Sequence, residues 1–262
     1  MQIFVINLDR NPVRWNRMAN LLVGLNFRRI AAVDGKNLEG PEYNTPGRQI
    51  CPEMLSRYNR ACLLSHRMVC QEFLSGSDPY CCVLEDDVLI SPDFPDFMNG
   101  IDWIPADAHA VKIETMGGSV WLAGKTIVCL NRVAKRLRSS HLGTAGYVVS
   151  RPGAQIILDL TIKPDRSIDR LLFEDDGLKK LRTYQLVPAL CIQSSRSGEK
   201  MIIQELESTI QPKATISVPA PRKPAWNKIQ RELSRPFRQL PGFPTWVARH
   251  CQGTRRHRVP FA

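Results

Sequence analysis

Apolar and polar positions change their spacing several times along the first ninety residues. Mainly apolar runs with the length of strands lie at residues 3–8, 27–33 and 80–84. Apolar positions with helical spacing occupy residues 11–24 and 55–74. Asp9 is placed to cap the first helix, and the proline-containing residues 36–54 are expected to form a loop. This order of elements predicts an α/β fold with a mostly parallel sheet and flanking helices.

The second half of the chain is less regular. Its apolar runs predict strands at residues 110–114, 126–130 and 144–150, and helices at 152–160 and 167–181. Pro152 suits the first turn of a helix, because its missing N–H would have no partner there. We expect a single domain over residues 1–212, followed by a separate extension over residues 213–262.

The charge separates these two regions. The chain carries a formal net charge of +11, and from Lys213 onward eleven Lys and Arg residues stand against one acid, Glu232. Residues 224–235 alternate basic and apolar positions with helical spacing, and Pro236 predicts an irregular remainder. Such a helix would bind an anionic membrane surface, or it could pack its apolar stripe on the main domain. Nucleic acid is not an expected partner, because the main domain is nearly neutral and carries no RNA-binding or zinc-finger pattern.

Cysteine use and hydropathy bear on the compartment. The eight cysteines form no C-x-x-C pair, so we expect reduced thiols. The chain begins on a strand-like run, and no stretch approaches the roughly 20 apolar residues that cross a bilayer. These features predict a cytoplasmic protein, peripheral on the cytoplasmic face of the membrane.

Two identical acidic triplets carry the candidate chemistry. Glu85, Asp86 and Asp87 follow a predicted strand, and ligands of open α/β sheets bind beyond the carboxyl ends of strands. Carboxylates there could share Mg²⁺ or Mn²⁺, which can hold a diphosphate in turn; a solvated acidic turn is the alternative. The second triplet, residues 174–176, lies on a predicted helix, where adjacent acids point in different directions. There we expect a solvated helix end.

Several separated segments together resemble glycosyltransferase family 25, the lipopolysaccharide and lipooligosaccharide galactosyltransferase-like family. They are "FVINLDRNPVRWNRM", "RRIAAVDGKNL", "ACLLSH", "CVLEDDVLISPDF", "GTAGYVVSRPGAQIIL", "SIDRLL" and "ELESTI". Their order and spacing match the family over about residues 1–210. The resemblance implies a GT-A type, Rossmann-like α/β fold, a UDP-sugar donor, Mn²⁺ or Mg²⁺, and inversion at the anomeric carbon.

The resemblance also implies roles for particular residues. Metal binding falls to Glu85 and Asp87, and donor binding to Asn7, Leu8, Arg10, Arg14, Asp34, Gly35, Ser65, His66 and Asp86. Several of these residues have a structural alternative. Position 14 could be a surface arginine and position 34 a turn aspartate, and residues 65 and 66 could be a partly buried pair whose hydrogen bonds only support the fold. The chain departs from the family at Arg57 and Asn59, where an acid and a glycine are expected, which puts acceptor specificity in doubt.

Inverting transfer needs a base that takes the proton of the acceptor hydroxyl. Asp169 is the candidate, Glu174 and Asp175 are the fallbacks, and a helix cap is the structural alternative for Asp169. The predicted function is transfer of a hexose from a UDP-sugar to a lipooligosaccharide or other glycan acceptor, with galactose as the first candidate for the hexose. The alternatives are a catalytically inactive GT-A-like scaffolding protein at the membrane surface and a metal-dependent phosphohydrolase.

Overall fold

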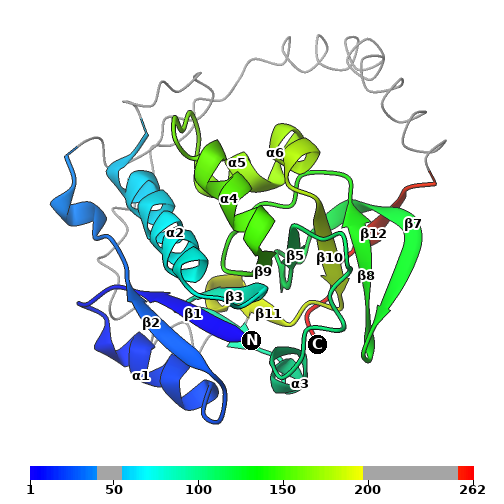
Figure 1. The fold of residues 1–262 in the computed structure, drawn as a ribbon, viewed down its shortest axis with the longest axis horizontal. Helices are drawn as coiled ribbons and strands as arrows, with labels where there is room; N and C mark the ends of the chain where they lie inside the picture. The colour runs from blue at the N-terminus through cyan, green and yellow to red at the C-terminus, as the bar shows by residue number, and fades with distance from the viewer. Residues whose placement is uncertain (40–54, 197–252) are drawn as a thin grey trace, which may run out of the picture.

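The computed structural model describes residues 1–39, 55–196 and 253–262, which build a mixed sheet flanked by helices (Figure 1). In the order in which they lie side by side, the nine strands are β12 (Arg255–Arg258), β7 (Ser119–Cys129), β8 (Arg132–Leu137), β10 (Thr183–Val187), β5 (Ala110–Lys112), β9 (Gly146–Ser150), β3 (Tyr80–Glu85), β1 (Gln2–Asn7) and β2 (Phe27–Ala31). A smaller sheet contains β4 (Val88–Ile90), β11 (Cys191–Gln193) and β6 (Glu114–Thr115).

The helices lie on both faces of the large sheet. They are α1 (Pro12–Leu21), α2 (Arg57–Ser75), α3 (Phe94–Met98), α4 (Arg151–Leu160), α5 (Ile168–Phe173) and α6 (Asp175–Lys180), with short 3₁₀ turns η1 (Gly35–Asn37) and η3 (Ser194–Arg196). Because strand side chains alternate between faces, Phe4 and Ile6 pack with α2, α4 and α5. Ile3 and Val5 pack on the other face with α1 and α3. The runs that form β1 and β3 are therefore strands buried on both sides, whereas β2 lies at the edge of the sheet and only its Ile30 is buried.

Strand directions place three carboxyl ends at one edge of the sheet. β1 pairs in parallel with both β2 and β3, and β5 pairs in parallel with β10. β9 runs antiparallel between β3 and β5, and β8 runs antiparallel to β10 and β7. The predicted α/β fold with a large sheet and flanking helices is confirmed, and the sheet is mixed because these antiparallel strands enter it.

Individual elements differ from the sequence prediction at a few places. The residue preceding α1 is Asn11, and Asp9 instead pairs with Arg29 at 2.6 Å, so the predicted Asp9 cap is wrong. The single helix predicted over residues 167–181 is two helices, α5 and α6, separated at Glu174, whose backbone is extended. Strands β8, β10 and β11 were not predicted.

The end of the basic extension belongs to the sheet. β12 pairs antiparallel with β7, and the buried Val259 accepts a 2.6 Å hydrogen bond on its carbonyl from the Thr115 hydroxyl. For residues 255–258 the prediction of an irregular remainder is wrong, because an open strand edge was available to pair them. The predicted amphipathic helix over residues 224–235 lies outside the described residues.

The described part of the chain also bears on the thiols and on membrane crossing. Its cysteines are free, as predicted: Cys62, Cys70, Cys81, Cys82, Cys129 and Cys191. Within the same described ranges, no helix combines the length and the apolar character needed to span a bilayer.

Candidate functional site

A pocket of about 180 Å³ lies beyond the carboxyl ends of β1, β2 and β3. This is the position at which open α/β sheets bind ligands. Seven of the residues singled out from the sequence line it: Leu8, Arg10, Gly35, Ser65, His66, Glu85 and Asp86. The structure therefore brings together segments that are up to 78 positions apart in the chain, from Leu8 to Asp86.

The loop after β2 forms one wall of this pocket. Gly35 is buried, and a Cβ atom at this position would lie 2.6 Å from Cδ1 and 3.1 Å from Cα of Tyr58, so a side chain here would push against the first turn of α2. Asp34 accepts hydrogen bonds from Arg10 Nε at 2.6 Å and from the backbone N–H of Lys36 at 2.9 Å. The Arg10 hydrogen bond is the main reason that the pKa of Asp34 is lowered. Asp34 therefore shapes the wall as a turn residue.

Asp86 joins the end of β3 to β1 and α1. Its two carboxylate oxygens accept hydrogen bonds from Asn7 Nδ2 at 2.7 Å and Arg14 Nη1 at 3.0 Å. Arg29 Nε donates to Asn7 Oδ1 at 2.8 Å, and Arg17 Nη2 donates to the Asp86 carbonyl at 3.2 Å. Asp86 is 7% exposed, so these protein partners satisfy a carboxylate that would otherwise be costly to bury.

Asp87 has a different environment. Its Oδ1 is buried and has no hydrogen-bond partner, and its Oδ2 lies 3.9 Å from Arg14 Nη1. Burial, with the nearby negative charge of Glu85, raises the pKa of Asp87 to about 7. A buried carboxylate oxygen without a partner is a candidate ligand for a cation.

Glu85 is directed toward α2. Its Oε1 accepts a 2.9 Å hydrogen bond from the Thr144 hydroxyl and lies 3.5 Å from His66 Nε2. Burial acts to raise the pKa of Glu85, but the hydrogen bond and charge of His66 outweigh it and lower the pKa. His66 is 1% exposed, and its Nδ1 lies 3.0 Å from the Tyr147 hydroxyl. The end of β3 is thus fixed by partners from α2 and β9.

Ser65 has a supporting role. Its hydroxyl donates to the Ala61 carbonyl at 2.8 Å and accepts a 2.9 Å hydrogen bond from the backbone N–H of Val33. These two bonds hold α2 against the loop that follows β2. Ser65 therefore sets the width of the pocket, and its hydroxyl is already engaged on both sides.

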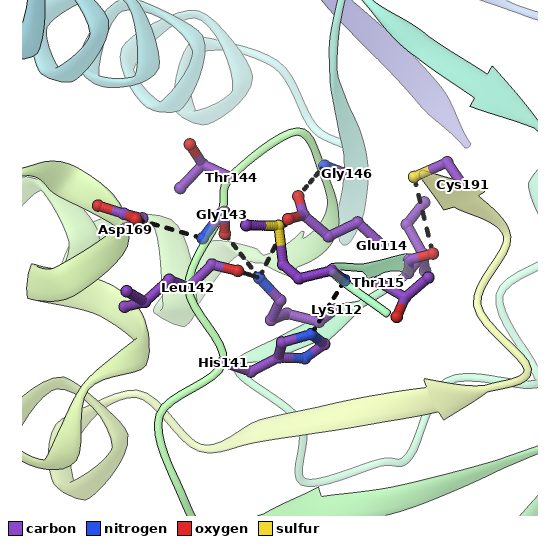
Figure 2. A network of polar contacts seen from close by, with 12 residues as sticks. Lys112, Glu114, Thr115, His141, Leu142, Gly143, Thr144, Gly146, Asp169 and Cys191 are labelled. Carbon is purple, nitrogen blue, oxygen red and sulfur yellow. Dashed lines mark hydrogen bonds and ion pairs between the residues drawn. The ribbon is translucent and has the colours of Figure 1, made fainter. Parts of the chain in front are cut away.

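Asp169 lies across the loop that precedes β9. One carboxylate oxygen accepts from the Gly143 N–H at 3.3 Å, and the other accepts from Ser167 Oγ at 2.5 Å and Arg170 N at 2.9 Å. The next residue, Thr144, donates to Glu85, so two adjacent loop residues reach the two carboxylates. Figure 2 shows the contact between Asp169 and Gly143, with Thr144 next to Gly143.

The second acidic triplet remains apart from this site. Glu174 pairs with Arg170 at 3.0 Å and Arg166 at 3.6 Å, and Asp176 pairs with Lys179 at 2.9 Å. Asp175 and Asp176 are exposed. The predicted solvated helix end is confirmed for these two aspartates.

Sequence reasoning missed a buried ion pair that supports the loop (Figure 2). Lys112 Nζ donates to the carbonyls of Leu142 at 3.1 Å and Gly143 at 2.6 Å, and lies 3.6 Å from Glu114 Oε1. Glu114 Oε2 accepts a 2.8 Å hydrogen bond from Gly146 N. Burial lowers the pKa of Lys112 and raises that of Glu114. The signal was present in "AVKIE", where two opposite charges stand two positions apart in an apolar strand.

Gly143 has φ of +93°, and a Cβ atom there would lie 1.9 Å from Glu114 Oε1. Glycine is therefore required at this point of the loop by backbone conformation and by space. The loop geometry that reaches Asp169 and Glu85 depends on this one residue.

The chain is similar in sequence to known glycosyltransferases over the residues that form this site. Residues 1–172 match the model of glycosyltransferase family 25 (LPS biosynthesis protein). The lacto-N-neotetraose biosynthesis glycosyltransferase LgtE of Neisseria gonorrhoeae is 33% identical over 153 residues, 53% of this chain and 54% of the relative. The lipooligosaccharide biosynthesis protein lic2B of Haemophilus influenzae is 27% identical over 220 residues, 79% of this chain and 78% of the relative.

The match to LgtB of Neisseria gonorrhoeae has the same extent as that to LgtE, with 33% identity over 150 residues. The chain thus spans about half the length of the first curated relatives it matches. The family match covers the pocket, the first acidic triplet, the Gly143–Thr144 loop and Asp169. Because this match extends over more than half of the chain, the protein belongs to glycosyltransferase family 25.

Proposed function

We propose that the protein transfers a hexose from a UDP-sugar to a lipooligosaccharide acceptor with inversion at the anomeric carbon. Galactose is the first candidate for this hexose. Family membership and the lipooligosaccharide biosynthesis relatives support this class of reaction. The observation that carries the proposal is the buried, partnerless carboxylate oxygen of Asp87, one residue beyond the acids that line the pocket.

A divalent cation, Mn²⁺ or Mg²⁺, fits this carboxylate. Asp87 offers the free oxygen, and Glu85 adds a second negative charge close enough to raise the pKa of Asp87. When bound, the metal would offset the negative charge that develops on the departing diphosphate. Asp86 would act as a positioning residue, because both of its oxygens already have protein partners.

The donor nucleotide would lie against the pocket wall formed by Leu8, Arg10 and Gly35, with Asp34 holding Arg10 through a 2.6 Å hydrogen bond. The Nε–H of Arg14 is buried and has no hydrogen-bond partner, so it is a donor available to a phosphate oxygen. The Nη1 of Arg14 meanwhile holds Asp86 at 3.0 Å. His66, fixed by Tyr147, would orient Glu85 at the inner end of the pocket.

Asp169 is the proposed base. The acceptor hydroxyl attacks the anomeric carbon, its proton passes to the Asp169 carboxylate, and the bond from the sugar to UDP breaks. Hydrogen bonds from Ser167 and Gly143 orient this carboxylate. Glu174 is a weaker candidate because two arginines pair with it, and Asp175 is a weaker one because it is exposed.

The acceptor would be reached at an anionic membrane surface on the cytoplasmic side. The described part of the extension contributes three exposed arginines on β12: Arg255, Arg256 and Arg258. They add to the basic residues between Lys213 and Arg249. Roughly 1 kcal/mol per basic residue near an anionic surface would concentrate the enzyme there.

Thermal-shift measurements with a panel of UDP-sugars, with and without Mn²⁺, test donor and metal together. A ligand that binds the folded state raises the melting temperature according to its concentration and affinity. We expect stabilisation by one UDP-sugar only when Mn²⁺ is present, and its loss in Asp87→Ala. Equal stabilisation of Asp87→Ala and the parent protein would contradict the assigned ligand. Release of intact UDP on addition of acceptor would distinguish transfer from phosphohydrolysis and from an inactive scaffold.

A further inference from the structure

A second group of metal-ligating side chains lies on the α2 side of Glu85. Cys62 and His66 are four positions apart on α2 and therefore lie on the same helix face. Glu85 approaches from the end of β3. One ligand atom from each of the three residues lies within 4.8 Å of the others, and no other group of three or more such side chains in the described ranges does so.

We propose that Cys62, His66 and Glu85 form a binding site for one thiophilic divalent cation of the Zn²⁺ type. Cysteine, histidine and glutamate are all zinc-ligand types, and a site with three protein ligands keeps a fourth position open. Mn²⁺ and Mg²⁺ prefer oxygen ligands, so this site would differ in metal preference from the one at Asp87.

The contacts of His66 also support the proposal. Its Nε2 is buried and faces the Glu85 carboxylate at 3.5 Å, a distance that is long for a hydrogen bond. A metal ion held between these two atoms would satisfy both of them. The other ring nitrogen, Nδ1, lies 3.0 Å from the Tyr147 hydroxyl, which fixes the orientation of the ring.

The outer contacts resemble those of a prepared metal site. Metal-binding histidine and carboxylate side chains are usually held by a second hydrogen-bond partner. Here Tyr147 holds His66, and the Thr144 hydroxyl holds Glu85 at 2.9 Å. The Tyr147 contact leaves His66 Nε2 directed at Glu85, and the oxygen that it faces, Oε1, is the one that Thr144 holds in place.

The local charge favours a cation, and the pocket gives it access. Burial raises the pKa of the Cys62 thiol, and the negative charges of Glu85, Asp169 and Asp87 raise it further. A bound dication would reverse this effect and displace the thiol proton to solvent, which leaves the thiolate as ligand. Cys62, His66 and Glu85 all line the 180 Å³ pocket, so the ion can enter and its fourth position faces the pocket.

Titration of the reduced, metal-free full-length chain with Co²⁺ tests the site without any sugar nucleotide. We expect one equivalent to produce a thiolate-to-cobalt charge-transfer band together with the intense visible bands of a four-coordinate ion. Zn²⁺ should remove both, and an excess of Mg²⁺ should not. Calorimetry in buffers of different ionisation enthalpy should show release of about one proton per Zn²⁺ near pH 7.

Variants assign the signal to these residues. Cys62→Ser should lose the charge-transfer band, whereas Cys70→Ser, a change at another buried thiol of α2, should keep it. Tyr147→Phe should keep the band and weaken the affinity by about 10- to 100-fold, as expected for loss of an outer partner. Circular dichroism would confirm that each variant is folded.

Absence of the band in the parent protein, or a band that persists unchanged in Cys62→Ser, would overturn the proposal. Neither result depends on transferase activity. A protein that binds Co²⁺ at Cys62 but no UDP-sugar would refute the proposed function alone. A protein that binds a UDP-sugar with Mn²⁺ but shows no thiolate band would refute the zinc site alone.

Discussion

The same three letters, EDD, occur twice in this chain and produce two different electrostatic environments. Glu85, Asp86 and Asp87 end a strand that is covered by helices on both faces. Residues 174–176 cover the junction of two short surface helices. The first triplet contains a carboxyl whose pKa is raised to about 7, whereas the exposed Lys179 lowers the pKa of Asp176. The acidic motif is therefore informative only together with the element that carries it.

The two regions also differ in how their charges are compensated. At the second triplet, exposed Lys and Arg side chains pair with the acids from the same helices. At the first triplet, the partners of Asp86 come from β1 and α1, more than 70 positions away in the chain. Asp87 Oδ1 is left without any partner. A site is indicated where the fold brings in distant partners and still leaves one buried group unsatisfied.

The largest expected effect separates the proposed base, Asp169, from an acid of the second triplet, Glu174. Asp169→Asn should lower the turnover number by about 10²–10⁴-fold, because the amide cannot accept the acceptor proton. Glu174→Gln should leave the rate within about twofold of the parent, since its arginine partners keep it at the surface. Steady-state kinetics with saturating donor measure both changes. A larger loss in Glu174→Gln than in Asp169→Asn would exchange their roles.

Sequence reasoning reached the fold and most of the pocket for an identifiable reason. Buried strands such as residues 3–8 are continuous apolar runs, and the parallel order of β2, β1 and β3 then brings Leu8 and Glu85 to one edge. The sequence could not show that both carboxylate oxygens of Asp86 have protein hydrogen-bond partners, because tertiary packing brings those partners to it.

The supporting loop escaped prediction for the same reason. Lys112 was read as part of an ordinary strand, and its contacts with Leu142 and Gly143 cross about thirty positions. Cys62 stands four positions before His66 on a predicted helix, which places both on one face, but no spacing indicates that Tyr147 or Glu85 meets them. The last strand, β12, follows a stretch of basic residues that favoured an irregular end.

Ion pairs in the two regions provide the next comparison. Lys112 and Glu114 are buried at 3.6 Å, whereas Lys179 and Asp176 are exposed at 2.9 Å. Lys112→Met should lower the free energy of unfolding by about 3–5 kcal/mol, because it leaves a buried carboxyl and two loop carbonyls uncompensated. Lys179→Met should cause no measurable change despite the shorter distance. Urea denaturation measures both.

Removal of the second charge is the control for the buried pair. The double variant Lys112→Met, Glu114→Gln should recover part of the lost stability, since no buried charge remains. A loss of stability equal for Lys112→Met and Lys179→Met would show that burial does not distinguish the two regions.

Substitution of the proposed metal ligand, Asp87, should have a somewhat smaller effect than the substitutions of Asp169 and Lys112. Asp87→Asn should reduce turnover by about 10²–10³-fold, the range for loss of one group that stabilises developing charge. Asp175→Asn, the matched change in the second triplet, should be silent because this aspartate is exposed. The test is turnover as a function of Mn²⁺ concentration. If Asp87→Asn retained the parent's metal dependence, the first triplet would lose its proposed role.

The smallest effect is a pH dependence that has opposite signs in the two regions. The folded-state pKa of Asp87 is about 7, above its ordinary value of 3.8, so between about pH 4 and 7 the folded protein holds a proton that the unfolded chain has released. The metal-free protein should therefore lose stability as the pH rises through this window, by at most roughly 1.4 kcal/mol per unit. Asp176, with its pKa lowered by Lys179, acts in the other direction and only below its ordinary value of 3.8.

Mn²⁺ competes with the Asp87 proton, so its affinity should rise by about fivefold from pH 6 to pH 7 and level off above pH 8. Melting temperatures across pH 5–8, with and without Mn²⁺, measure both effects, and Asp87→Asn should flatten the curve. A parent protein whose Mn²⁺ affinity is unchanged over this range would show that Asp87 is not the metal ligand.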